Sequence, residues 1–102
     1  MAVTKIEEKD FKKLAVDSKK KVLVDCYATW CGPCKMLGPV IDSVSEENDE
    51  YEFYKLDVDD AEEISREYGI MSIPTLLVFD KGELVNKSVG LISKEDLKKL
   101  LK

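Results

Sequence analysis

The sequence predicts an α/β fold in which a central mixed β-sheet is flanked by helices on both faces. Strand and helix patterns alternate in the order β-α-β-α-β-α-β-β-α. The segment 22–27 is apolar except for Asp25, which is typical of a central strand buried on both faces. The last two strand patterns, 75–79 and 84–89, are only four residues apart, so they predict an antiparallel hairpin. A sheet packed between helices buries all of these apolar stripes.

The spacing of apolar residues predicts two strand–helix pairs in the first half of the chain. Residues 3–6 form a short β-like start, and three apolar side chains of residues 8–16 fall on one helical face. The strand 22–27 follows. From 34 to 48 the apolar residues recur at the i, i+3, i+4 and i+7 spacing of a helix, and Pro39 inside this run predicts a kink.

Turn and cap residues delimit the elements of the second half. Residues 51–58 are rich in aromatic and β-branched side chains, which favours a strand. The segment 61–68 has a helical pattern that ends at Gly69, a natural C′ residue. Ser93, with Asp96 three residues later, predicts the N-cap of a closing helix with a leucine stripe.

Size and charge limit the possible classes of protein. With 102 residues and 11.6 kDa, we expect one domain over residues 1–102. The net charge of −5 repels phosphate backbones and anionic lipid surfaces, so we expect neither nucleic acid nor a membrane as a partner. Apolar runs reach at most four residues, far below the ~20 of a membrane span. The first residues show no signal-peptide pattern, so we expect no export.

The content of histidine and cysteine limits the chemistry. The chain has no histidine, which excludes Cys-His and Ser-His nucleophilic pairs and histidine-based metal sites. Its three cysteines, an odd number, are not the paired framework of a small secreted domain. We therefore expect a cytoplasmic protein.

Residues 30–35, Trp-Cys-Gly-Pro-Cys-Lys, lie where the buried strand gives way to the long helix. Cys31 and Cys34 fall three positions apart in the first helical turn, so their sulfurs lie on one side. The unpaired N–H groups of a helix start favour thiolate, and such positions lower thiol pKa values from about 8.5 to about 3.5–7.5. We predict that Cys31 is the nucleophile. Cys34, which we expect to be more deeply buried, would resolve the mixed disulfide.

Two other interpretations of the cysteine pair remain open. A C-x-x-C pair is half of a zinc site, but four ligands are needed, and the only other thiol, Cys26, projects from the preceding strand. Free cysteines also serve as small packing residues. Gly32 and Pro33 between the cysteines and Trp30 beside them argue against plain packing, because proline suits a first helical turn and glycine allows close approach of another chain.

Several separate segments carry a likeness to one family. They are Val22-Leu23-Val24-Asp25, the 30–35 motif, Pro39, Lys55-Leu56-Asp57-Val58-Asp59, Tyr68-Gly69-Ile70, Ile73-Pro74-Thr75-Leu76 and Val89-Gly90. Over essentially its whole length the chain resembles the thioredoxin family. This resemblance implies the thioredoxin fold and a dithiol–disulfide oxidoreductase. The protein would reduce protein disulfides through a Cys31/Cys34 redox pair and a mixed disulfide, with no bound cofactor and no metal.

The resemblance also assigns roles to two charged residues. Asp25 is similar to the family's buried carboxylate, which exchanges a proton with Cys34, and desolvation would raise its pKa. The alternative is an aspartate at a strand end that faces water. Lys55 resembles the family's lysine that approaches this aspartate, and a solvated strand lysine is the alternative.

A docking surface is implied by the same resemblance. Ile73-Pro74 is similar to the family's cis peptide, which faces the cysteines and lets the Ile73 backbone pair with an extended client segment. The implied substrate-binding residues are Trp30, Gly32, Pro33, Met71, Ser72, Ile73, Pro74, Gly90 and Leu91. Each of them could equally serve ordinary packing.

The implied partners are client proteins with reducible disulfides and a thioredoxin reductase, a flavoprotein linked to NADPH or ferredoxin. We expect a monomer. The chain departs from many relatives at Cys26-Tyr27, where they carry an aromatic pair, and we interpret Cys26 as a buried spectator, with modification or intermolecular pairing as the alternative. Two other functions stay open: a disulfide oxidant or isomerase, which a reduction potential above about −200 mV would favour, and a redox-insensitive binding subunit.

Overall fold

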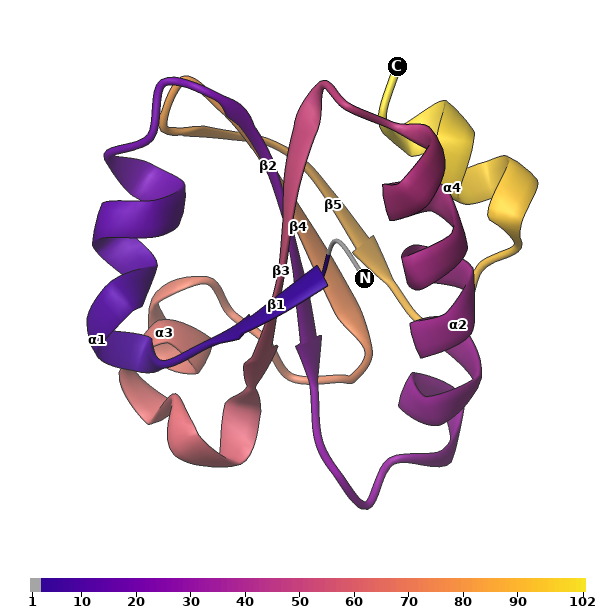
Figure 1. The fold of residues 1–102 in the computed structure, drawn as a ribbon. Coiled ribbons are helices and arrows are strands. Elements are labelled where there is room, and N and C mark those ends of the chain that lie inside the picture. The colour runs from indigo at the N-terminus through magenta and orange to yellow at the C-terminus, as the bar shows by residue number, and fades with distance from the viewer. Residues whose placement is uncertain (1–2) are drawn as a thin grey trace.

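A computed structural model describes residues 3–102 and contains a five-stranded mixed sheet with strand order β1-β3-β2-β4-β5 (Figure 1). Strands β1, β2 and β3 are parallel, whereas β4 is antiparallel to β2 and to β5. The predicted element order is confirmed. The strands are β1 (Val3–Ile6), β2 (Lys21–Tyr27), β3 (Tyr51–Asp57), β4 (Thr75–Asp80) and β5 (Glu83–Val89). The helices are α1 (Glu8–Phe11), η1 (Lys12–Val16), α2 (Gly32–Glu47), η2 (Val58–Asp60), α3 (Glu62–Glu67) and α4 (Lys94–Leu100).

Helices cover both faces of the sheet, as predicted. Figure 1 shows α1 and α3 on one face and α2 and α4 on the other. Each face has its own apolar core: Phe11 and Ala61 pack in the first, and Leu37 and Leu97 in the second. Strand β2 serves both cores because successive side chains alternate in direction, with Val24 in the first and Leu23 in the second.

Several element boundaries differ from the sequence-based expectation. The predicted helix 8–16 is one α-helical turn, α1, followed by the π-helix η1. Helix α2 begins at Gly32, two residues before the apolar pattern that starts at Cys34, so the cysteines lie at its first turn as the motif predicts; the helix continues through Pro39. Strand β3 ends at Asp57, whose side chain accepts a hydrogen bond from the Asp59 N–H (3.0 Å) and so starts the 3-10 helix η2.

The predicted turn and cap chemistry is confirmed at three places. Gly69, after α3, has a positive φ of 62°. Lys81 and Gly82 both have positive φ, 54° and 85°, which makes the β4–β5 connection a tight turn of the type that hairpins favour. The Ser93 hydroxyl accepts a hydrogen bond from the Asp96 N–H (3.1 Å) and caps α4.

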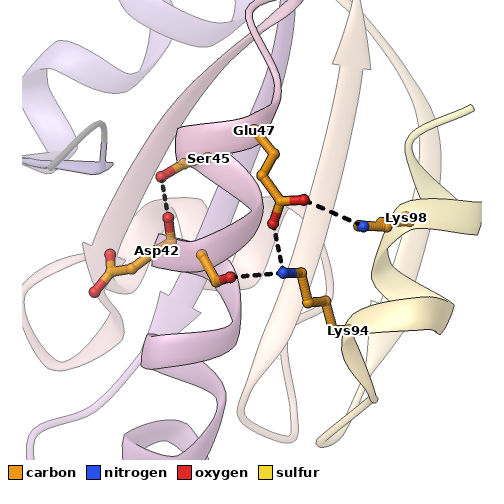
Figure 2. Close-up of polar contacts among 6 residues, drawn as sticks. Asp42, Ser45, Glu47, Lys94 and Lys98 are labelled. Carbon is orange, nitrogen blue, oxygen red and sulfur yellow. Dashed lines mark hydrogen bonds and ion pairs between the residues drawn. The ribbon is translucent and has the colours of Figure 1, made fainter.

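Polar contacts hold the C-terminal half of α2 against α4 (Figure 2). The Glu47 carboxylate pairs with Lys94 and, at 3.3 Å, with Lys98. The Lys94 ammonium also donates to the Ser43 hydroxyl (2.8 Å). These contacts support the helix that carries the cysteines at its other end. Of the helices that the structure describes, none is both long and apolar enough to cross a membrane.

Candidate active site

Cys31 and Cys34 form a disulfide at the start of α2, with their Cα atoms 5.3 Å apart. The loop after β2 brings them to the C-terminal ends of the parallel strands, at the lower end of the sheet in Figure 1. Cys31 is the N-cap of α2, and Pro33 lies in the first turn, where its missing N–H would have no helical acceptor. The predicted pairing of the two sulfurs is therefore confirmed.

The helix start places a hydrogen-bond donor beside Cys31 Sγ. The Cys34 backbone N–H donates to Cys31 Sγ at 3.2 Å, so the sulfur occupies the place that a serine or aspartate oxygen takes in an ordinary N-cap. The positive end of the α2 dipole lies at the same position. Both effects stabilise negative charge on Cys31 Sγ once the disulfide is reduced.

The two cysteines are equally buried, which differs from the expectation that Cys34 is the deeper one. Each residue is 5% exposed and packs with Ala28. Cys31 Sγ lies 3.8 Å from the carbonyl oxygen of Ile73. The structure shows the oxidised form, in which the Cys31–Cys34 bond holds both cysteines against Ala28.

Asp25 is a buried carboxylate beside the disulfide, as the sequence predicts. The residue is 5% exposed, and its Oδ1 has no hydrogen-bond partner among the described residues. Burial raises the pKa of Asp25 to about 7, the Lys55 charge opposes the rise and the Asp42 charge adds to it. A hollow of about 320 Å³ lined by Asp25, Cys34 and Lys55 connects this carboxylate with the second cysteine.

Lys55 lies beside Asp25 but forms no ion pair with it. The two residues are register partners on the parallel strands β2 and β3. The Lys55 ammonium lies 5.7 Å from the centroid of the Tyr27 ring, and no Lys55–Asp25 pair within 4.0 Å occurs in the part of the chain that the structure describes. The lysine therefore acts on the carboxylate through space, across the hollow.

The loop before β4 faces the disulfide, and its Ile73–Pro74 peptide bond is cis, as the resemblance implies. The Gly90 N–H donates to the Pro74 carbonyl (2.8 Å), and the Thr75 hydroxyl donates to the Ser72 carbonyl (2.6 Å). Sequence reasoning missed Thr75. These two bonds fix the carbonyl groups around the cis peptide and leave the Ile73 backbone facing Cys31.

The predicted docking residues surround the disulfide with graded exposure. Trp30 is 68% exposed, Met71 95% and Leu91 44%. Gly32, Pro33 and Ser72 are also exposed, Ile73 and Gly90 are half-buried, and Pro74 is buried. The structure thus brings all of these residues to the end of the sheet where the disulfide lies, although Pro74 offers little surface.

Trp30 has a partner that sequence reasoning missed. Its indole Nε1–H donates to Asp59 Oδ2 at 2.8 Å. The available signal was the second aspartate of the Lys55-Leu56-Asp57-Val58-Asp59 segment, but nothing in the sequence alone places it beside the tryptophan. The bond ties the loop after β2 to η2.

Cys26 lies on the other side of the sheet from the disulfide. It is fully buried in the core under α1 and α3, and burial raises the pKa of its thiol to about 12. Such a thiol is neutral and inaccessible, which fits the spectator interpretation. Among residues 3–102 no three cysteine or carboxylate side chains gather as candidate metal ligands.

The fold and this site define a class of protein, the dithiol–disulfide oxidoreductases: a cysteine pair bonded at a helix start, beside a buried carboxylate and a cis-proline loop. The sequence matches the thioredoxin family over residues 2–102. It is 51% identical to thioredoxin of Mycoplasmoides gallisepticum over 85% of this chain and 87% of that one. It is 45% identical to thioredoxin of Bacillus subtilis over 99% and 96%. It is also 47% identical to thioredoxin-1 of Saccharomyces cerevisiae over 74% of each.

The chain therefore belongs to the thioredoxin family. It is a protein-disulfide reductase that works through the Cys31/Cys34 pair, and other redox proteins are its partners.

Proposed function

We propose that the two cysteines divide the reaction between them. In the reduced protein, the Cys31 thiolate attacks a client disulfide, forms a mixed disulfide and releases the other client sulfur as a thiolate. Cys34 then attacks Cys31 Sγ, and the second client sulfur leaves. Two electrons pass to the client, whose two thiolates take up protons from solvent, and Cys31–Cys34 is oxidised; Cys34 gives up the one proton that the protein releases. The Cys34 N–H at 3.2 Å from Cys31 Sγ is the observation that carries this assignment.

In this proposal Asp25 accepts the proton that Cys34 must lose before it attacks. The shared hollow and the Asp25 pKa of about 7 support this role, because a base near neutral pKa takes up and returns a proton in the physiological range. Lys55 restrains the rise of that pKa by its charge. Lys55 thus adjusts the pKa of Asp25 by its charge, without forming a salt bridge with the carboxylate.

The exposed residues around the disulfide are proposed to bind the client. An extended segment would pair with the Ile73 backbone and lie against Trp30, Met71 and Leu91, with Gly32 and Pro33 open to it and Ser72, Pro74 and Gly90 shaping the loop. The exposure of Trp30 and Met71 supports this surface.

The cellular setting is part of the same proposal. We place the protein in the cytoplasm as a one-domain monomeric electron carrier that a flavin-dependent thioredoxin reductase, fed by NADPH or ferredoxin, returns to the dithiol state. Partners of this kind supply the two electrons that each turnover removes. The odd number of cysteines supports a reducing compartment, and the net charge of −5 supports partners other than nucleic acid and anionic membranes.

Reduction of insulin disulfides with dithiothreitol as the electron source tests the function. The wild type should accelerate reduction, and Cys31→Ser should abolish the acceleration. Cys34→Ser, reduced and mixed with insulin after removal of dithiothreitol, should instead accumulate a covalent adduct that added dithiothreitol releases. Adducts on Cys34 in Cys31→Ser but none on Cys31 in Cys34→Ser would reverse the assigned order. If Cys31→Ser and Cys34→Ser both worked as well as the wild type, the cysteines would not be the reacting groups, which would favour a redox-insensitive binding role.

A further inference from the structure

Most of the net negative charge of the protein lies on η2 and α3, and η2 contacts Trp30 beside the disulfide. Residues 58–67, which contain η2 and α3, carry five carboxylates and one basic residue, Arg66. Their net charge of −4 compares with −5 for the whole chain, so the other residues sum to −1. We call this segment the acidic wall.

A second hollow lies between this acidic wall and the loop before β4. It has a volume of about 370 Å³, and its lining consists of five apolar residues and Ser65, apart from the two carboxylates named next; the apolar residues are Trp30, Val58, Ile70, Met71 and Ile73. Asp59 and Glu62 form its rim on the η2–α3 side. Of the described residues that line it, none is basic. Its size and lining suit one bulky apolar side chain.

The rim charges are available to a partner. Asp59 and Glu62 are exposed. Asp59 accepts the Trp30 indole N–H, which leaves its other oxygen and its negative charge free. Glu62 pairs with Arg66 at 2.9 Å, but both side chains are largely exposed, and exposed pairs of this kind bind weakly. A cation in the hollow would therefore add to these contacts rather than compete with a buried pair.

We propose that this hollow, which we call the acid-rimmed hollow, selects client segments in which an apolar residue and lysine or arginine flank the reactive cysteine. The apolar side chain fills the hollow, and the basic side chain lies against Asp59 and Glu62. The segment enters from the Trp30–Ile73 side, where Cys31 Sγ lies 3.8 Å from the Ile73 carbonyl. The inference rests on the proposed client-binding surface and adds a charge preference to it.

Charge complementarity of this kind acts mainly on the rate of encounter and falls with salt, because the Debye length shrinks from about 30 Å at 0.01 M to about 3 Å at 1 M. Each exposed pair that forms should contribute about a 2–5-fold difference in rate.

Three disulfide peptides test the proposal. They have the same leucine next to the reactive cysteine and differ only at two flanking positions, which are lysine, glutamine or glutamate. Single-turnover mixing with the reduced protein, acid quenching and mass spectrometry give the second-order rate constants. At 0.02 M ionic strength the lysine peptide should react at least about 4-fold faster than the glutamate peptide, with the glutamine peptide between them. At 0.5 M the three should converge.

Two matched double variants locate the effect. Asp59→Asn with Glu62→Gln removes the rim charges and keeps an acceptor for Trp30. Glu50→Gln with Glu83→Gln removes two charges at the opposite end of the sheet. Glu50 is paired with Lys21, just as Glu62 is paired with Arg66, so each double variant breaks one ion pair. The rim variant should lose most of the lysine preference, and the remote variant should keep it.

Equal rates for the lysine and glutamate peptides would overturn the charge selection. So would an equal loss of the lysine preference in the two double variants. In either case, reduction of the glutamine peptide would still uphold the proposed function. Failure to reduce any peptide would overturn both.

Discussion

The Glu8 side chain accepts a hydrogen bond from the backbone N–H of Ile64 at 2.8 Å, across 56 positions of sequence. Helix α3 begins after Ala61, which has no side-chain acceptor, so one of its free N–H groups is satisfied from α1 instead. The bond joins the two helices that cover one face of the sheet. It supports the helix that follows η2 and forms the acidic wall.

Glu8→Ala should lower the free energy of unfolding by about 1–2 kcal/mol, because it leaves this partly buried N–H without an acceptor. Glu8→Gln, which keeps an oxygen acceptor, should lose less. Chemical denaturation of the oxidised protein measures both. Glu7→Ala is the control, since Glu7 makes only an exposed pair with Lys9 at 3.4 Å. An equal loss from Glu7→Ala would contradict the capping role.

Asp25→Asn should stabilise the oxidised protein at neutral pH and much less at pH 4. The folded-state pKa of Asp25 is raised from 3.8 to about 7, so the folded protein binds the proton more tightly than the unfolded chain. The stability that this proton supplies is complete below pH 4 and is lost as pH rises to about 7. The difference between variant and wild type should therefore grow by roughly 4 kcal/mol between pH 4 and pH 8.

Urea unfolding of both proteins at each pH measures this difference, in which the titration of all other groups cancels. Asp80→Asn, at the far end of the sheet, is the control and should show no such growth. A constant difference between Asp25→Asn and wild type from pH 4 to pH 8 would mean that Asp25 titrates normally. The same variant should slow client reduction if Asp25 accepts the Cys34 proton.

Two neighbouring charges should move the Asp25 pKa in opposite directions. Lys55→Met removes the positive charge that lowers this pKa, so the pKa should rise. Asp42→Asn removes a negative charge that raises it, so the pKa should fall. Carbon-13 NMR titration of the Asp25 carboxyl group in the oxidised protein reads both shifts directly. Shifts of the same sign, or none, would contradict the opposite effects assigned to the two charges.

The predictability of the site follows from the range of the interactions that build it. Cys31 and Cys34 are neighbours in sequence, so helix geometry alone brings their sulfurs together. The burial of Asp25 is predictable because its flanking residues on one strand are apolar. In contrast, the partners of Trp30 and Ile64 come from other elements, and nothing distinguishes Asp59 or Glu8 among 21 acidic residues before the chain folds.

The fold shows the same division. The alternating patterns predict all five strands and the helical regions of α1, α2, α3 and α4, but not the 3-10 helix η2. The apolar pattern of α2 starts only at Cys34, two residues after the first residue of the helix, Gly32. The boundary moves because Cys31 itself is the N-cap, and a sulfur acceptor is not among the usual cap residues. The break of the first helix into α1 and η1 leaves no mark in the apolar spacing.

Two glycines that look alike in sequence should respond oppositely to alanine. At Gly82 the φ of 85° is strained for alanine, and an added Cβ would lie 2.2 Å from the Val16 carbonyl oxygen, which is backbone and cannot move aside cheaply. At Gly38, inside α2, an added Cβ meets nothing within 4 Å. Gly82→Ala should cost at least about 2 kcal/mol, because backbone strain and a steric clash add together.

Gly38→Ala should instead gain about 0.5–1 kcal/mol through helix propensity. Urea unfolding of both variants measures the contrast, and it isolates the hairpin turn because Gly82 lies at the end of the sheet opposite to the cysteines. Insulin reduction by folded Gly82→Ala should consequently match the wild-type rate. If Gly82→Ala were as stable as the wild type, the β4–β5 turn would have to lie farther from the Val16 carbonyl at the end of η1, so that an alanine Cβ fits between them.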